Sequence, residues 1–164
     1  MLNTDYAALP SSVDHDHHHC RASAIQKAEK LCLQRGVRFT EIRKQVLELI
    51  WESHCAVKAY DLLDKIKPHL GSAKPATVYR ALDFLLEQGL IHKVESLNAY
   101  IGCSHADHKH EQLLLTCTRC HEVEERTGEK VMDAIAQELK KAGFVVQYKA
   151  LEIHGLCAKC ASNR

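Results

Sequence analysis

Hydrophobic residues recur at helical spacing in four successive stretches of the first half of the chain. The pattern predicts helices over about residues 23–35, 40–50, 59–67 and 75–88. Ser23 and Thr40 are candidate N-caps, Pro75 suits a first helical position, and Gly36 and Pro68 are expected to end helices. The inward-facing positions are Ile25, Ala28, Leu31, Cys32, Ile42, Val46, Leu49, Ile50, Leu62, Leu63, Ile66, Val78, Leu82, Leu85 and Leu86.

Two short strand-like runs, 90–94 and 99–103, follow the fourth predicted helix and are joined by a polar turn. Helices followed by such a hairpin are typical of a winged helix-turn-helix domain, here predicted over residues 20–102. A generic helical domain with a β appendage would give the same pattern. The helix that begins at Pro75 would turn Thr77, Arg80, Asp83 and Glu87 outward, with Tyr79 near the boundary of its buried face.

A smaller unit is predicted over residues 103–164. It contains an apolar strand at 112–116, an acidic strand at 122–125, a helix over about 130–142 and an alternating strand at 144–153. Such a unit buries little apolar surface alone, so metal and a second subunit are expected to complete it. The predicted fold class is therefore α+β, with an N-terminal winged helix-turn-helix domain followed by a small α/β dimerisation domain. Residues 1–19 have no regular period and are predicted to form a mobile, His-rich arm.

Composition places the chain among globular proteins, because 46% of its 164 residues are hydrophobic and 26% are charged. No apolar run approaches the roughly 18 residues of a membrane span, and the N-terminus does not resemble a signal peptide, so a cytoplasmic location is expected. The net charge of +1 conceals +4 over residues 20–101 and −3 over residues 1–19. A local basic excess is compatible with nucleic acid binding despite the near-neutral total.

The strongest chemical signal is a pair of C-x-x-C motifs, Cys117 with Cys120 and Cys157 with Cys160, separated by 36 residues. In the reducing cytosol, eight cysteines are more typical of metal ligands or core residues than of disulfides. Two such pairs can enclose one tetrahedral Zn²⁺, which leaves no open position for substrate and therefore predicts a structural site. A redox function remains the alternative for either pair taken alone.

A second, looser group of potential ligands lies at the end of the hairpin and the start of the smaller unit. It comprises His92, Cys103, His105, His108, His110, Glu122, Glu124 and Glu125. A metal site built from these residues would connect the two units, so that occupancy could set their relative orientation. Cys32 is expected in the core, whereas no role is assigned to Cys20 or Cys55.

The run KPATVYRALDFLLEQGLIHKVES at 74–96, with RFT at 38–40 and HGLCAKC at 154–160, closely resembles the ferric uptake regulator family. The resemblance covers residues 21–160 and is greatest to the zinc-responsive branch. It implies two Zn²⁺ per subunit. The implied structural site is Cys117, Cys120, Cys157 and Cys160, and the implied regulatory site is His92, Cys103, His110 and Glu125, with His105 or His108 as substitutes for His110.

The Cys103 thiolate favours zinc over ions that prefer oxygen ligands. An iron or peroxide sensor of the family is the alternative, but those members carry a His-rich run before the first cysteine of the structural site. Here that run is absent, and Lys149 replaces a histidine that many members use in a third site. A third site is therefore not expected.

The resemblance also implies that Tyr79 and Arg80 contact operator DNA, with Arg38, Arg43 and Lys74 as weaker candidates for phosphate contacts. The implied function is a homodimeric repressor that binds a palindromic operator when zinc is present and controls zinc uptake genes. A zinc hydrolase or thiol oxidoreductase is the alternative from another class. We predict no enzyme, because neither site keeps an open position beside a general base and no H-E-x-x-H motif or nucleophile elbow occurs.

Overall fold

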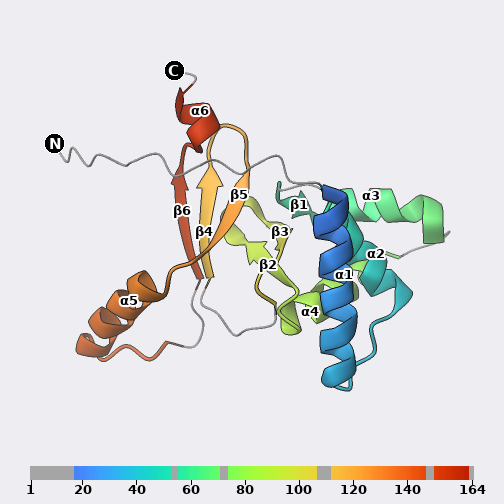
Figure 1. The fold of residues 1–164 in the computed structure, drawn as a ribbon, viewed down its shortest axis with the longest axis horizontal. Coiled ribbons are helices and arrows are strands. Elements are labelled where there is room, and N and C mark those ends of the chain that lie inside the picture. The colour runs from blue at the N-terminus through green and yellow to red at the C-terminus, as the bar shows by residue number, and fades with distance from the viewer. Residues whose placement is uncertain (1–16, 53–54, 71–73, 107–111, 147–149, 163–164) are drawn as a thin grey trace.

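The computed structural model describes residues 17–52, 55–70, 74–106, 112–146 and 150–162. Its helices α1 to α4 gather on one side of the molecule (Figure 1). The C-terminal sheet lies on the other side with helices α5 (Glu129–Lys141) and α6 (Ala158–Ser162). These four helices span His17–Gln34 (α1), Glu41–Ile50 (α2), Ala59–Leu70 (α3) and Pro75–Glu87 (α4). The predicted order of four helices followed by a hairpin is thus confirmed.

The main hydrophobic core lies among α1 to α4 and the hairpin that follows them. Most positions predicted to face inward are buried in it, including Cys32, which is 1% exposed. The predicted helix stop at Gly36 is also confirmed, since this glycine has a φ of +66° in the left-handed region.

Three details of the helices differ from the sequence prediction. Helix α1 begins at His17 rather than after Ser23, so the end of the predicted 1–19 arm is helical. Thr40 occupies the N-cap position of α2, but its hydroxyl makes no capping hydrogen bond. Helix α3 continues through Pro68 to Leu70, because the φ of proline is helical and the loss of one backbone hydrogen bond does not forbid a final turn.

The wing is a three-stranded antiparallel sheet in the order β1-β3-β2. Its strands are Val57–Lys58 (β1), Ile91–Val94 (β2) and Ala99–Gly102 (β3). The short β1 was not predicted, because two residues carry no periodic signal. Between β2 and β3 the chain forms a 3-10 turn, Glu95–Leu97 (η1), which we call the wing tip.

The second sheet has the order β5-β4-β6. Strand β4 (Gln112–Cys117) is central, antiparallel to β5 (Val123–Thr127) and parallel to β6 (Ala150–Gly155). Helices α5 (Glu129–Lys141) and α6 (Ala158–Ser162) precede and follow β6. The predicted strand at 144–153 was too long, since β6 begins at Ala150 and the exposed Phe144 and Val145 are outside it.

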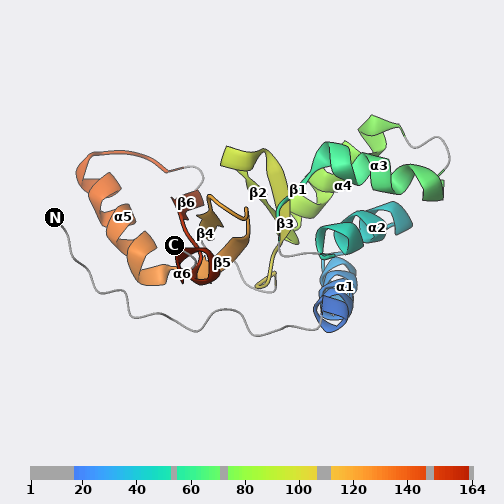
Figure 2. The same cartoon turned by 90° about the horizontal axis from the view of Figure 1, so that it is seen from above.

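The wing lies between the helices and the second sheet in both views (Figures 1 and 2). A small hydrophobic cluster joins them, formed by Val94 and Ile101 of the wing with Leu114 and Val123 of the second sheet. An isolated antiparallel bridge between Cys55 and Glu122 adds a backbone connection. Within the described residues, no helix combines the length and apolarity needed to cross a bilayer.

Candidate metal centres and candidate nucleic-acid interface

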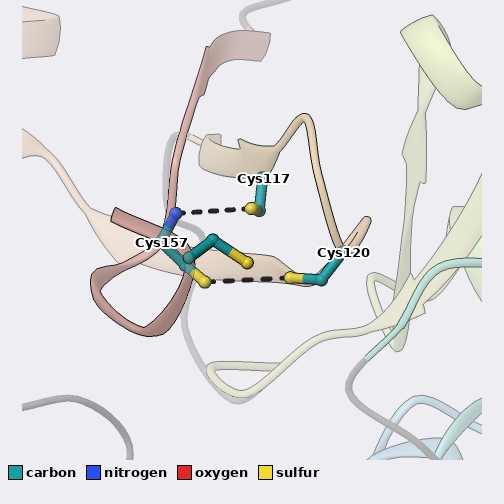
Figure 3. Close-up of side chains that lie close together, drawn as sticks. Cys117, Cys120 and Cys157 are labelled. Carbon is teal, nitrogen blue, oxygen red and sulfur yellow. Dashed lines mark hydrogen bonds between the residues drawn. The ribbon is translucent and has the colours of Figure 1, made fainter. Parts of the chain in front are cut away.

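The two predicted C-x-x-C pairs come together at one end of the second sheet. Cys117 ends β4 and Cys120 follows in the next turn, while Cys157 and Cys160 lie at the start of α6. Their four sulfur atoms all lie within 4.8 Å of one another, and we call this group the four-cysteine cluster. Figure 3 shows Cys117 and Cys120 facing Cys157, whose sulfur lies 3.7 Å from that of Cys120. This donor set has the number, type and spacing that a tetrahedral Zn²⁺ requires.

Hydrogen bonds outside the four thiols hold the two pairs together. The guanidinium of Arg119 donates to the carbonyl oxygen of Cys160 at 2.7 Å. The backbone N–H of Thr118 donates to the carbonyl of Gly155 at 2.8 Å. These bonds link the turn after β4 to the segment after β6, so the fold itself brings the two cysteine pairs close.

Two thiols of this cluster, those of Cys117 and Cys160, have opposite pKa shifts. Backbone N–H groups of Cys120 and Cys157 lower the pKa of Cys117 to about 6. Burial, with the neighbouring thiols of Cys157 and Cys120, raises the pKa of Cys160 to about 12. At neutral pH the cluster therefore holds a thiolate at Cys117 and a thiol at Cys160, and a bound cation would stabilise further thiolates.

A second cluster lies where the wing meets the second sheet. His92 of β2, Cys103 just after β3 and Glu125 of β5 place one ligand atom each within 4.8 Å of the others. Nε2 of His92 is 2.6 Å from a carboxylate oxygen of Glu125, and the side chains of both residues are at most 4% exposed. The Sγ atom of Cys103 lies 3.8 Å from the same oxygen. An imidazole, a thiol and a carboxylate so enclosed form a donor set that suits Zn²⁺.

The fourth ligand implied by the resemblance, His110, lies outside the described residues, as do His108 and Lys149. His105 lies near the cluster, with Nδ1 3.9 Å from the second carboxylate oxygen of Glu125 and a side chain 42% exposed. That oxygen also accepts a hydrogen bond of 2.8 Å from the backbone N–H of Ser104. Sequence reasoning missed this bond, because a backbone donor leaves no sequence signal.

Helix α4 presents its polar side to solvent as predicted. Tyr79 is 51% exposed and Arg80 is exposed beside it, whereas Val78 and Leu82 are buried. Lys74, the N-cap residue of this helix, is also exposed. The helix therefore offers an aromatic hydroxyl and a guanidinium on one accessible side, which are groups that contact bases and phosphates in DNA complexes.

Arg43 has local partners that the sequence did not indicate. Its guanidinium stacks over the ring of Phe84 at 3.5 Å from the centroid and donates a hydrogen bond to the carbonyl of Arg38. Arg43 thus packs the start of α2 against α4, a structural role in addition to any phosphate contact. Arg38 is exposed.

Two further features near the second cluster were not predicted. The ring of Trp51, the only tryptophan in the chain, lies directly against the backbone of Gly102, the residue before Cys103. The carboxylate of Glu152 on β6 accepts hydrogen bonds from the backbone N–H groups of Glu95 and Ser96 at the wing tip. Burial raises the pKa of Glu152, but the bonds from Ser96 and Glu95 outweigh it and leave the pKa below its usual value.

Together these elements define a class of protein: a winged-helix domain joined to a small α/β domain, with the four-cysteine cluster in the second domain and another cluster at the junction of the two. The sequence profile described as "Ferric uptake regulator family" matches residues 34–154. The chain belongs to that family. The predicted fold class is thereby confirmed.

Individual relatives point to one branch of the family. The zinc uptake regulation protein of Escherichia coli strain K12 is 47% identical over 137 residues, which cover 83% of this chain and 80% of the relative. A solved structure of a zinc uptake regulator complexed with zinc and DNA superposes with a TM-score of 0.82 at 44% identity, covering 87% of this chain and 96% of the other.

Two further solved structures are the holo and the apo form of one protein. Holo XcZur superposes with a TM-score of 0.79, covering 85% of this chain and 98% of the other, at 43% identity. Apo XcZur has the same 43% identity but a TM-score of only 0.51, covering 86% and 97%. The arrangement of this chain is thus closer to that of the holo form.

Proposed function

We propose that this chain is a zinc-responsive transcriptional repressor, which binds operator DNA as a zinc-loaded homodimer and releases it when zinc is scarce. The observation that carries the proposal is the cluster of His92, Cys103 and Glu125 at the contact between wing and second sheet. Its ligands come from both domains, so filling it favours one domain arrangement. The regulated genes would be those of zinc uptake, as the name of the Escherichia coli relative suggests.

Zinc is preferred to iron because of the ligands themselves. Cys103 supplies a soft thiolate, and with Glu125 it contributes two negative charges that balance one divalent cation. His92 and a further histidine, His110 or alternatively His105 or His108, would complete a tetrahedral set. A bound cation would also offset the cost of burying a carboxylate at Glu125 beside the sulfur of Cys103. The second zinc of each subunit belongs to Cys117, Cys120, Cys157 and Cys160.

The mechanism is a linkage between zinc and DNA. His92 of the wing, Cys103 next to it and Glu125 of the second sheet would share one Zn²⁺, and this shared ligation would hold the wing on the second sheet. That contact orients α4 relative to the domain through which two subunits would associate. DNA and zinc favour the same arrangement, so each tightens binding of the other by the same factor.

Homodimerisation is supported by apolar surface on the second domain. The alternation of β6 turns Glu152 towards the wing and Ile153 to the opposite side of the sheet. Large exposed apolar side chains of this domain are Val131, Phe144, Val145, Ile153 and Leu156. Burial of such side chains between two subunits would pair two copies of α4, so that Tyr79 and Arg80 meet both halves of a palindromic site.

The regulatory role makes this chain a binding protein of the cytoplasm rather than an enzyme. The donor sets support this, because a site of four cysteines leaves no position for a substrate. The deciding experiment is operator binding by Cys103→Ser, with Cys20→Ser as control, in zinc-buffered solution and in strong chelator. Zinc-dependent binding should disappear in Cys103→Ser and persist in Cys20→Ser. Binding by Cys103→Ser that still follows the zinc concentration would reject the assignment.

A further inference from the structure

One face of the second sheet carries a row of three residues that lie against the wing. Leu114 of β4 pairs with Glu125 across the antiparallel ladder and with Glu152 across the parallel one. Residues paired in this way point to the same face of a sheet. We call Glu125, Leu114 and Glu152 the docking row.

The first two members of the row hold the base and the middle of the wing. Glu125 contacts His92 and the backbone of Ser104. Leu114 is fully buried in the cluster that contains Val94 and Ile101. Of these two contacts, the first contains the proposed regulatory zinc ligands, whereas the second is purely apolar.

The third member, Glu152, holds the wing tip. Its two carboxylate oxygens accept hydrogen bonds from the backbone N–H of Glu95 at 2.6 Å and of Ser96 at 3.2 Å. The side chain is only 13% exposed, and His154 stands 3.8 Å away as a potential counter-charge. These are charge-assisted bonds to the first N–H groups of the η1 turn, which have no partner within that turn.

We propose that Glu152 is a positioning residue that holds the wing tip on the second sheet without metal, so that zinc binding only has to close the base of the wing. The inference rests on the proposed function and deepens it, since it assigns part of the zinc sensitivity to a residue outside both metal clusters. Without Glu152, ordering of the wing tip would have to accompany zinc binding. The apparent zinc affinity would then fall in proportion to the fraction of molecules that are competent to bind.

The test measures the zinc dependence of the proposed homodimer, with all 164 residues of the chain present. Operator binding and Trp51 fluorescence are followed across buffered zinc concentrations for wild type, Glu152→Ala and Glu152→Gln. The matched controls are Glu138→Ala and Glu138→Gln on α5, where the carboxylate is 72% exposed and forms a surface ion pair with Lys141. Glu152→Ala should shift the zinc midpoint to about tenfold higher concentration, within the usual range of coupling between sites.

Saturating zinc should restore most of the operator affinity of Glu152→Ala, because Glu152 affects the zinc equilibrium and not the DNA contacts. Glu152→Gln should fall between wild type and Glu152→Ala, since its amide keeps one accepting oxygen. Zinc at the four-cysteine cluster should remain in every variant. A zinc midpoint of Glu152→Ala equal to that of the Glu138 controls would overturn the proposal. If Glu152→Ala does not fold, the same comparison is made with Glu152→Gln.

Amide hydrogen exchange separates this proposal from the proposed function. Exchange at Glu95 and Ser96 is measured without DNA and with regulatory zinc removed by chelator. If the two amides are protected from exchange in wild type and lose that protection in Glu152→Ala, Glu152 holds the wing tip, whether or not the protein represses transcription. Equal exchange in wild type and Glu152→Ala would overturn the proposed role of Glu152. Zinc-independent operator binding by wild type would overturn only the proposed function.

Discussion

Nε2 of His92 lies 2.6 Å from a carboxylate oxygen of Glu125, although the two residues are 33 positions apart in the chain. The pair joins strand β2 of the wing to strand β5 of the second sheet. Both side chains are almost fully buried, so each ionisable group depends on the other and on nearby donors for its solvation. The domain junction is therefore built around polar groups that favour a bound cation.

Loss of one structural thiolate should remove one zinc per subunit and destabilise the second domain. We expect Cys157→Ser to retain only the regulatory zinc and to lose about 3 kcal/mol or more of unfolding free energy, which lowers Tm by about 6–12 °C. Metal analysis and thermal unfolding measure both effects, with Cys20→Ser as control. Full zinc content and an unchanged Tm would refute a structural site at the four cysteines.

Zinc binding at the four-cysteine cluster should release more protons as the pH falls. Near pH 7.5, the thiol of Cys160 must lose its proton on binding, because its pKa is raised to about 12. Cys117 is already a thiolate there, because its pKa is about 6, but it is protonated at pH 5. We therefore expect about one additional proton per zinc at pH 5 and weaker binding as protons compete.

Calorimetry in buffers of different ionisation enthalpy counts these protons. The Cys103→Ser protein isolates the four-cysteine cluster by disabling the regulatory site. Proton release that stays constant from pH 7.5 to 5 would show that the thiol of Cys117 has no lowered pKa.

A methyl group added at Gly102 should disturb the regulatory cluster through Trp51. A Cβ at this position would overlap the indole ring of Trp51, so the ring or strand β3 must shift next to Cys103. We expect Gly102→Ala to lose about 1–3 kcal/mol of unfolding free energy and to bind regulatory zinc more weakly. Denaturant unfolding and Trp51 fluorescence report both effects.

Gly155→Ala is the matched control, because no atom lies within 4 Å of a Cβ built there. Its unfolding free energy should stay within about 0.5 kcal/mol of wild type. If Gly102→Ala behaved like this control, the close packing of Trp51 would have no energetic consequence.

Removal of the Arg80 guanidinium should weaken operator binding and leave zinc binding intact. A base contact of this kind contributes about 1–3 kcal/mol of discrimination, or about 5- to 150-fold in affinity. Fluorescence anisotropy with operator and scrambled DNA measures it, with Lys140→Ala on the remote α5 as control. An unchanged preference for operator in Arg80→Ala would exclude Arg80 from base recognition.

The parts of the structure that sequence predicted are those that depend on local pattern. Helix α4 was predicted from Pro75 and its apolar spacing, and the four-cysteine cluster from two short motifs with fixed ligand chemistry. The extension of α3 past Pro68 escaped prediction, because proline usually ends a helix although its fixed φ is itself helical. The start of α1 at His17 escaped for a related reason, since its first three residues are histidines, which set no apolar period.

Contacts between distant strands needed the structure. Glu152 is one of 21 acidic residues in the chain, and nothing in its neighbourhood marks it as a partner of the wing tip. Its role follows from the register that places it beside Leu114, and register between strands of different segments is a tertiary property. For the same reason, His92 was linked to Glu125 through the family resemblance and not through spacing.

The most direct test of zinc-dependent repression measures zinc per subunit and operator occupancy together across buffered zinc concentrations. We predict two zinc ions per subunit at saturation, with the first bound throughout the range and operator occupancy rising only as the second binds. Replacement of Cys103 by serine should stop the titration at one zinc and abolish the rise. Operator binding that is complete with one zinc per subunit, or independent of zinc, would contradict this mechanism.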